Sequence, residues 1–439
     1  MPATPDVSVL CNLLFFFQIK LTIVLLKMQY SEGLADEIQS ETVEQQLLRE
    51  EVEKTLKLPA LPESEKKEPG LAETIPENFA FEPHSFLKKM LHPERLNDDQ
   101  KMKDIAWYEV DQLCNEVIVN LMNEQNLVSV SVPVTIVGDI HGNFHDLYRA
   151  LLARTNPDMI EERTSVKVRP FARDRFIFLG DYINVGKRSI ECLCLLFALK
   201  ATSPHRFTLL RGSQEGPIGK HFLTSLEELT PFYANKLQKK FEEVFSWMPL
   251  AAVVGEKIFC VHGGISPHLG SLKDIDKIPR PLLDVKENIL ATDLIFSDPL
   301  DYEFLHVPKK EPIFEANYLR HAGVLFNEAT VEEFCERTGM KLIVRSHTMI
   351  PFGYRLFANR KMITIFTSTG YKKERNHGSV MKVDKDGKIT MINFLPAPLK
   401  KKKKKDENEQ GNDDTNTRTT LDTQTVRTDA TTMISERAI

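Results

Sequence analysis

Aspartate and histidine residues recur along the chain in short segments rich in glycine or serine. The segments read GDIHG at 138–142, GDY at 180–182, VHGG at 261–264 and RSH at 345–347. Their candidate ligands are Asp139, His141, Asp181, His262 and His347. Carboxylate oxygens and neutral imidazole nitrogens bind hard or borderline divalent metals. The residue types therefore predict a metal site that contains no thiolate.

Each segment follows a short apolar run with the composition of a buried strand. These runs cover 134–137, 176–179, 258–260 and 342–344. Strands that each end in Asp or His bring those side chains together at one edge of a sheet. Helical apolar spacing at 105–123 and an apolar helix at 189–200 alternate with the strands, which indicates an α/β fold.

The composition is that of an ordinary globular protein, with 42% hydrophobic and 27% charged residues among 439. A net charge of −5 argues against a general nucleic-acid binder, so we expect no specific nucleic-acid partner. The six cysteines are scattered and several lie in apolar stretches. This usage predicts a reducing compartment, cytoplasmic and/or nuclear.

Residues 1–27 form an apolar N-terminal run, and its central part, 7–26, is nearly long enough to span a bilayer. Lys20 within it would cost roughly 2.5–3.5 kcal/mol on insertion scales. No basic residue precedes the run, so the polarity of a signal peptide is missing. Two interpretations stay open: a membrane anchor, or an incorrect upstream start with translation beginning at Met28.

The rest of the chain divides by composition into three parts. Residues 28–78 read as a polar extension, 79–397 as the globular domain and 398–439 as a Lys/Thr-rich tail. The tail has almost no apolar residues and is expected to be disordered. Its lysine run, Lys400 to Lys405, is interpreted as a nuclear-import address, an anionic-surface contact or a solvated segment.

The motifs resemble the phosphoprotein phosphatase family of serine/threonine phosphatases, most closely its protein phosphatase 1 branch. The resemblance covers about residues 80–397, and FSDP at 296–299 is similar to the family's WSDP. MPLAA at 248–252 likewise resembles its LPxAA segment. The resemblance implies a calcineurin-like metallophosphoesterase β-sandwich flanked by helices, with a dinuclear metal site at strand ends.

The same resemblance implies two divalent metals, drawn from Mn, Fe and Zn. Asp139, His141 and Asp181 would hold one of them. Asp181 would bridge to the second, which His262 and His347 would also hold. Two cations about 3.5–4 Å apart clamp a phosphate and activate a water near neutral pH.

Four departures fall on positions that carry catalysis in the family. The GNHE motif reads GSQE at 212–215, so Ser213 replaces an amide ligand of the second metal and leaves that site weakened. Gln214 replaces the histidine that protonates the leaving oxygen, and Asn184 replaces the aspartate that orients it. Val185 replaces a phosphate-gripping arginine. Loss of a general acid alone typically costs about 10²–10⁴ in rate.

Two phosphate-binding positions are retained. Arg320 falls on a second phosphate-binding arginine of the family, and Tyr371 on the tyrosine of its SAPNY loop, which reads TSTGY here. The next residue, a cysteine in the protein phosphatase 1 branch, is Lys372. Either the site still binds a phosphate that it hydrolyses poorly, or both residues are kept for packing.

The resemblance also implies a channel for RVxF-type regulatory peptides, bound as an added strand. Leu356, Ile363 and Met391 keep this channel apolar, whereas Gly387 and Lys388 stand where two apolar residues are expected. A lysine in this channel would have to lose the hydration of its charge, which is unfavourable. We therefore expect RVxF-type binding to be altered.

These observations predict a divergent serine/threonine phosphatase family member that is a catalytically impaired pseudophosphatase. It would bind metal together with a phosphoprotein or a regulatory protein. One alternative is a slow but genuine metal-dependent protein serine/threonine phosphatase. The other is a structural scaffold without metal.

Overall fold

The computed structural model describes residues 75–92, 102, 104–153, 174–300 and 311–396. They all belong to one compact unit, Pro69–Ile439. The apolar N-terminal run, most of the polar extension and the tail lie outside the described residues. Within the described ranges, no helix has the length and apolarity needed to cross a membrane.

The strands that carry the first two motifs belong to a five-stranded sheet. Its order is β14 (Ile389–Phe394), β13 (Gly378–Val383), β2 (Val134–Val137), β3 (Phe176–Phe178) and β4 (Phe207–Leu209). Strands β2, β3 and β4 are parallel, so their carboxyl ends meet at one edge. The β13–β14 hairpin completes the sheet, with β13 antiparallel to β2.

The strands that carry the last two motifs belong to a six-stranded sheet. Its order is β1 (Leu127–Val130), β5 (Ala251–Val254), β6 (Ile258–Val261), β10 (Leu342–Arg345), β12 (Met362–Ile365) and β11 (Tyr354–Phe357). Strand β10 runs parallel to both β6 and β12. A small third sheet contains β7 (Asp298–Pro299), β9 (Val324–Phe326) and β8 (Phe314–Ala316).

The two large sheets pack face to face, as the alternation of side chains along each strand requires. Ile177 of β3 and Cys260 of β6 belong to one buried cluster between the sheets. Their neighbours Phe178 and Phe259 belong to separate clusters on the two outer faces. The alternation therefore produces three apolar cores in a β-sandwich covered by helices on both sides.

Six helices share the core on the outer face of the five-stranded sheet. They are α3 (Pro83–Met90), α4 (Trp107–Met122), α5 (Phe144–Leu152), α6 (Ser189–Thr202), α7 (Lys220–Leu229) and α8 (Ala234–Trp247). Helix α6 is the central one, because every residue from Cys192 to Lys200 is buried. The prediction of an apolar helix at 189–200 is confirmed.

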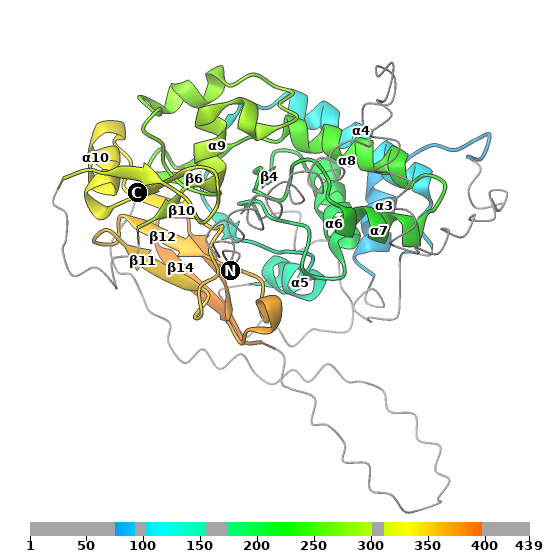
Figure 1. Cartoon of the computed structure of the whole chain (residues 1–439). Coiled ribbons are helices and arrows are strands. Elements are labelled where there is room, and N and C mark those ends of the chain that lie inside the picture. The colour runs from blue at the N-terminus through cyan, green and yellow to red at the C-terminus, as the bar shows by residue number, and fades with distance from the viewer. Residues whose placement is uncertain (1–74, 93–101, 103, 154–173, 301–310, 397–439) are drawn as a thin grey trace, which may run out of the picture. The chain divides into compact units, whose positions relative to one another are not determined.

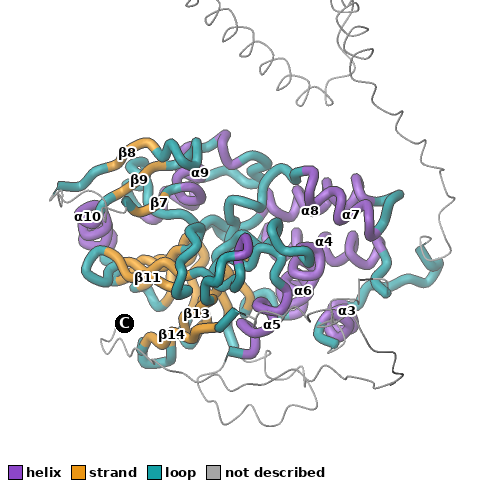
Figure 2. The backbone as a smooth tube through the Cα atoms, turned by 60° about the horizontal axis from the view of Figure 1, so that its bottom comes forward, coloured by secondary structure: helices purple, strands orange, loops and turns teal. Residues whose placement is uncertain are grey.

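The outer face of the six-stranded sheet is covered by α9 (Ile289–Phe296), α10 (Glu328–Thr338) and short 3₁₀ helices that include η5 (Leu272–Lys277) and η6 (Val285–Glu287). Helix α10 begins at Asn327, whose side chain accepts a hydrogen bond from the amide of Thr330, and ends at Gly339 with φ 73°. Figures 1 and 2 show α10 on the side of the strands opposite to α4, α6 and α8.

The two sheets are tied together where the candidate ligands lie. A parallel bridge joins Asp139, just beyond β2, to Phe366, just beyond β12. The amide of Ser368 also donates to the carbonyl of Asp139. The carboxyl ends of strands from both sheets are thereby brought to one place. The strand pattern predicted that the ligands meet at the edge of a single sheet, whereas their strands belong to two packed sheets.

Candidate metal centre

The candidate ligands follow directly on the strands, in sharp turns. Three of them, His141, Asp181 and His347, have φ of 47°, 54° and 65°. Left-handed backbone at a residue other than glycine costs of order 1–3 kcal/mol and persists only where the surroundings impose it. Strain of this kind clusters at functional sites, so these turns are a first structural sign of one.

The first group consists of Asp139, His141 and Asp181, all buried, with ligand atoms within 4.8 Å of one another. His141 Nε2 lies 3.2 Å from Asp139 Oδ2 and 3.7 Å from Asp181 Oδ2. Two carboxylates thus face one imidazole nitrogen. This donor set suits a divalent cation.

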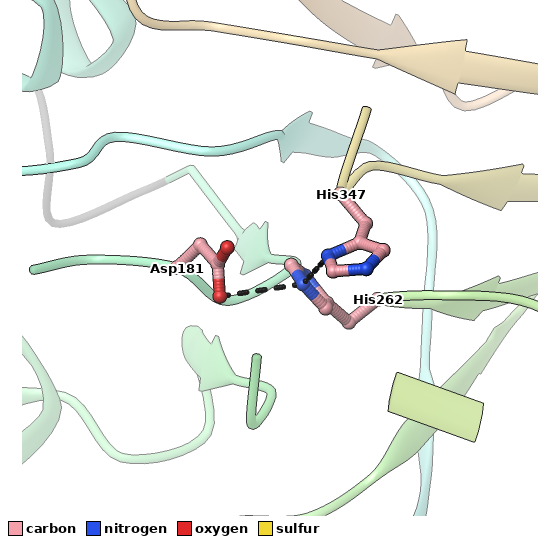
Figure 3. Close-up of side chains that lie close together, drawn as sticks. All are labelled: Asp181, His262 and His347. Carbon is pink, nitrogen blue, oxygen red and sulfur yellow. Dashed lines mark hydrogen bonds and ion pairs between the residues drawn. The ribbon is translucent and has the colours of Figure 1, made fainter. Parts of the chain in front are cut away.

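The second group consists of Asp181, His262 and His347, again buried and within 4.8 Å (Figure 3). His262 Nε2 lies 3.0 Å from His347 Nδ1 and 3.3 Å from Asp181 Oδ1. Two nitrogens about 2.0–2.1 Å from one tetrahedral metal would lie about 3.4 Å apart. The observed separation of 3.0 Å between the two imidazole nitrogens is close to that value. Asp181 belongs to both groups, as expected of a bridging ligand.

Backbone carbonyls orient two of the imidazoles. His141 Nδ1 donates to the carbonyl of Ile183 at 3.2 Å, and His262 Nδ1 donates to that of Leu179 at 2.9 Å. Each hydrogen bond engages the proton on Nδ1 and turns Nε2 toward the carboxylates, where it can bind a metal. Partners of this kind fix the tautomer of metal-binding histidines.

Asp139 is prepared as a ligand on one oxygen only. Its Oδ1 accepts hydrogen bonds from the hydroxyl of Ser346 and, at 3.1 Å, from the amide of His347. Its Oδ2 is buried, accepts no backbone or hydroxyl hydrogen bond, and faces Nε2 of His141 at 3.2 Å. A buried carboxylate oxygen needs a positive partner, which either a protonated His141 or a cation at the first group would supply.

The charges of the site also favour a cation. Burial opposes a charge on His141, but hydrogen bonding to Asp139 and the charges of Asp139 and Asp181 raise its pKa to about 9. Burial and the neighbouring His262 lower the pKa of His347 well below its usual range. Positive charge is therefore favoured between the two carboxylates, where the first group lies.

Glu215 holds the turn that presents Asp181. Its carboxylate accepts hydrogen bonds from the amides of Asp181 at 2.7 Å, Tyr182 at 2.8 Å and Gly212 at 3.0 Å. Burial, followed by the charge of Asp181, raises the pKa of Glu215 to about 8. The sequence motifs predict no separate role for Glu215, although its place beside GSQ at 212–214 is a usable signal.

The degenerate positions form one chain of hydrogen bonds. Asn184 Nδ2 donates to Gln214 Oε1 at 2.7 Å, and Gln214 Nε2 donates to Ser213 Oγ at 3.2 Å. Ser213 Oγ in turn donates to both oxygens of Asp181, at 3.0 and 2.9 Å. Val185 is 44% exposed beside them. The four substituted residues are thus at the metal groups or next to them.

Arg320 lies beside the second group. Its Nη2 donates to the carbonyl of His347 at 3.1 Å, and its Nε donates to Asp298 Oδ2 at 2.9 Å. Asp298 also accepts from Arg345 Nη2 at 2.8 Å. Burial would raise the pKa of Asp298, but the charges of Arg345, His347 and Arg320 outweigh it and hold this pKa well below its usual range.

Tyr371 lies beside the first group. Its ring centroid is 4.8 Å from that of His141 and 5.1 Å from that of Phe366. Burial, with the charges of Asp139 and Asp181, raises the pKa of the Tyr371 hydroxyl. The structure therefore brings both retained phosphate-binding candidates, Arg320 and Tyr371, to the candidate ligands.

The residues singled out for the peptide channel do not share one environment. Ile363 and Met391 belong to the buried core between the sheets, and Leu356 on β11 is half-buried. Gly387, with φ 76°, and exposed Lys388 lie in the β13–β14 turn. Lys388 therefore projects from a turn rather than from a strand.

Comparisons with known proteins agree with this geometry. Residues 132–351 match the family model for calcineurin-like phosphoesterases. The chain is 32% identical over 290 residues to a serine/threonine-protein phosphatase, PP1-delta, of Caenorhabditis elegans, covering 65% of this chain and 87% of that one. A protein serine/threonine phosphatase from Saccharomyces cerevisiae, described as similar to human phosphatase PP5, has the same fold. The TM-score is 0.58 at 19% identity, over 72% of this chain and 98% of that one.

Proposed function

The chain belongs to the calcineurin-like phosphoesterases and, among them, to the phosphoprotein phosphatase family, and on this premise we propose that it is a catalytically impaired member. This pseudophosphatase would bind divalent metal and a phosphorylated protein. Its partners would be phosphoproteins or regulatory proteins of the cytoplasm and/or nucleus.

The proposed metal ligands are Asp139, His141, Asp181, His262 and His347. The two buried groups with their shared Asp181 support this assignment, as does the buried Oδ2 of Asp139, which faces Nε2 of His141. When bound, Mn, Fe or Zn ions would neutralise the charge of a phosphate and supply a nucleophilic water near neutral pH. The protein's own part is to orient the imidazoles and to keep the carboxylates buried.

The observation that carries the proposal is the hydrogen bond between Asn184 and Gln214. In the family an imidazole at the position of Gln214 delivers a proton to the leaving oxygen. Here the Gln214 amide accepts from Asn184 and donates to Ser213. A carboxamide has no titratable proton to give, so the leaving oxygen departs without a general acid.

Two further substitutions would weaken the site. Ser213 uses its hydroxyl as a donor to Asp181, where an amide side chain would offer a carbonyl oxygen to the second metal. Val185 brings no cation to the phosphate. Residues that act as a unit lose their effect together, so we expect low turnover rather than four independent losses.

Phosphate binding would rest on Arg320 and Tyr371. The guanidinium of Arg320 is held by Asp298 and by the carbonyl of His347, and is therefore preorganised. We propose that regulatory peptides of the RVxF type bind this chain weakly or in a different way. The lack of apolar side chains at Gly387 and Lys388, where the resemblance expects two, supports that proposal.

The test measures turnover of a phosphoserine peptide by the full chain with Mn²⁺, beside the variant Ser213→Asn, Gln214→His, Asn184→Asp and Val185→Arg. Metal content of both proteins is measured in parallel. Turnover by the restored protein alone supports a pseudophosphatase. Comparable turnover by the natural chain would make it a genuine phosphatase. A natural chain that takes up no metal while the restored chain does would be a metal-free scaffold.

A further inference from the structure

The loop between β12 and β13 carries an excess of positive charge. We define the basic loop as residues 371–377, which read YKKERNH. Lys372, Lys373 and Arg375 are exposed, and Glu374 is the only carboxylate among these seven residues. Across the described ranges, none of the three cations forms an ion pair. Exposed cations that form no ion pair are available to an anionic ligand.

The conformation of the basic loop is fixed by hydrogen bonds. Asn376 is buried, accepts from the amide of Tyr371 at 2.9 Å and donates to the carbonyl of Ser368 at 2.7 Å. Lys372 and Lys373 have φ of 49° and 71°. Two successive left-handed lysines are costly, so the cations are presented by a strained turn rather than by a random surface segment.

The basic loop begins at the candidate metal centre. Lys372 Nζ lies 5.2 Å from the ring centroid of Tyr371, and that ring lies 4.8 Å from the ring of His141. Because these distances are consecutive, the ammonium is within about 10 Å of the His141 ring. An extended peptide covers about 3.3 Å per residue, so 10 Å corresponds to about three residues.

We propose that the basic loop binds a second anionic group of the same phosphoprotein, within three residues of the phosphorylated one. The second group is a carboxylate or another phosphate. This inference rests on the proposed function, because it requires a phosphorylated residue at Arg320 and Tyr371. It identifies the preferred ligand as an acidic or multiply phosphorylated segment.

Charge complementarity favours this ligand over a neutral one. Position 185, where the family has an arginine, is occupied by Val185 and offers no cation. Lys372, on the tyrosine side of the centre, offers a cation to the second anionic group rather than to the first phosphate. The negative charges of the bound peptide segment would therefore interact mainly with the cations of the basic loop and with Arg320.

The experiment measures binding of three fluorescent peptides to the full chain with Mn²⁺ at low and at physiological salt. One peptide carries a single phosphoserine among neutral residues. The second adds glutamates two and three residues away, and the third adds a second phosphoserine at three residues. The variant is Lys372→Ala with Lys373→Ala, and the matched control is Lys385→Ala with Lys388→Ala, which removes two exposed lysines from the β13–β14 turn.

We expect the added anions to tighten binding about 3–20-fold, the range for two exposed ion pairs. The loop variant should lose this gain but bind the singly phosphorylated peptide within about 2-fold of the natural chain. The control should retain the gain. Added salt should reduce the gain, because exposed ion pairs are screened.

The outcomes separate the two proposals. If the single phosphoserine peptide binds and the extra anions add nothing, the inference fails and the proposed function stands. If the loop variant and the control lose the gain in affinity equally, the inference also fails, because the gain would then come from non-specific electrostatic attraction. If no phosphopeptide binds the natural chain, both proposals fail.

Discussion

Asn184 and Gln214 are joined by a hydrogen bond of 2.7 Å between the amide of the first and the carbonyl oxygen of the second, although 30 positions separate them. The pair stands where the family resemblance places an aspartate and a histidine. Two neutral carboxamides thus maintain a side-chain contact without a proton that could be transferred. The fold can keep this contact while the chemistry changes, because the carboxamide of Asn184 supplies a donor and that of Gln214 supplies an acceptor.

Restoring the proton donor should raise turnover selectively. In the variant Gln214→His with Asn184→Asp, we expect at least about 10²-fold faster hydrolysis of a phosphoserine peptide, the low end of general-acid catalysis. An aryl phosphate, whose leaving oxygen hardly needs protonation, should gain far less. Equal gains on both substrates, measured by phosphate release, would contradict the assigned role of Gln214.

Divalent metal should stabilise the folded chain through His262. With Mn²⁺ at 100 times its dissociation constant, binding to the folded state alone contributes about 2.7 kcal/mol. The variant His262→Ala should lose most of this, while His268→Ala, at an exposed histidine six residues on, should keep it. Thermal unfolding with and without Mn²⁺ measures both. An equal shift in the two variants would place the metal elsewhere.

Gly212 should not accept a side chain. A Cβ there would lie 2.2 Å from the amide nitrogen of Asp181 and 2.5 Å from its Oδ1. We expect Gly212→Ala to cost about 1–3 kcal/mol of folding free energy, the usual cost of overpacking, and to weaken Mn²⁺ binding. Gly216→Ala, where nothing lies within 4 Å, is the control. Denaturant unfolding compares the free energy of unfolding of the two variants, and an equal loss in both would contradict the prediction.

Asp298 should make an acid-sensitive contribution to stability. Its pKa is held well below the usual range, so its stabilisation is complete above the ordinary aspartate pKa and is lost as the pH falls below it. Asp298→Asn leaves the buried guanidinium of Arg345 without its carboxylate, which should cost about 3–5 kcal/mol near neutral pH. The deficit should shrink in acid. A deficit independent of pH between 7 and 3 would show that charge is not the cause.

Glu215→Gln should loosen the turn at Asp181. The carboxylate accepts three backbone hydrogen bonds, and a glutamine would turn its NH₂ group toward at least one of those amides. A buried donor left unsatisfied costs about 1–3 kcal/mol. We expect a loss of that size in unfolding experiments, together with weaker Mn²⁺ binding. Unchanged metal affinity in a destabilised variant would limit Glu215 to a structural role.

Local sequence was sufficient for the four strands that precede the motifs and for the type of each ligand. The apolar run 134–137 coincides with β2, and helical spacing at 105–123 predicts α4, which spans Trp107–Met122. An apolar run is buried on one or both faces regardless of which elements pack against it, so its pattern predicts the strand or helix that it forms. The described cysteines, which lie in apolar stretches, are all buried and unpaired.

The sequence by itself determined the α/β fold class and the ligand types, because these follow from composition and local order, and its resemblance to the family implied which catalytic residue types are replaced. Only the tertiary structure decided that Asn184 bonds to Gln214 and that Arg320 is held by Asp298. These relationships join residues 20 or more positions apart. Their distances depend on how two sheets pack, which no local pattern specifies.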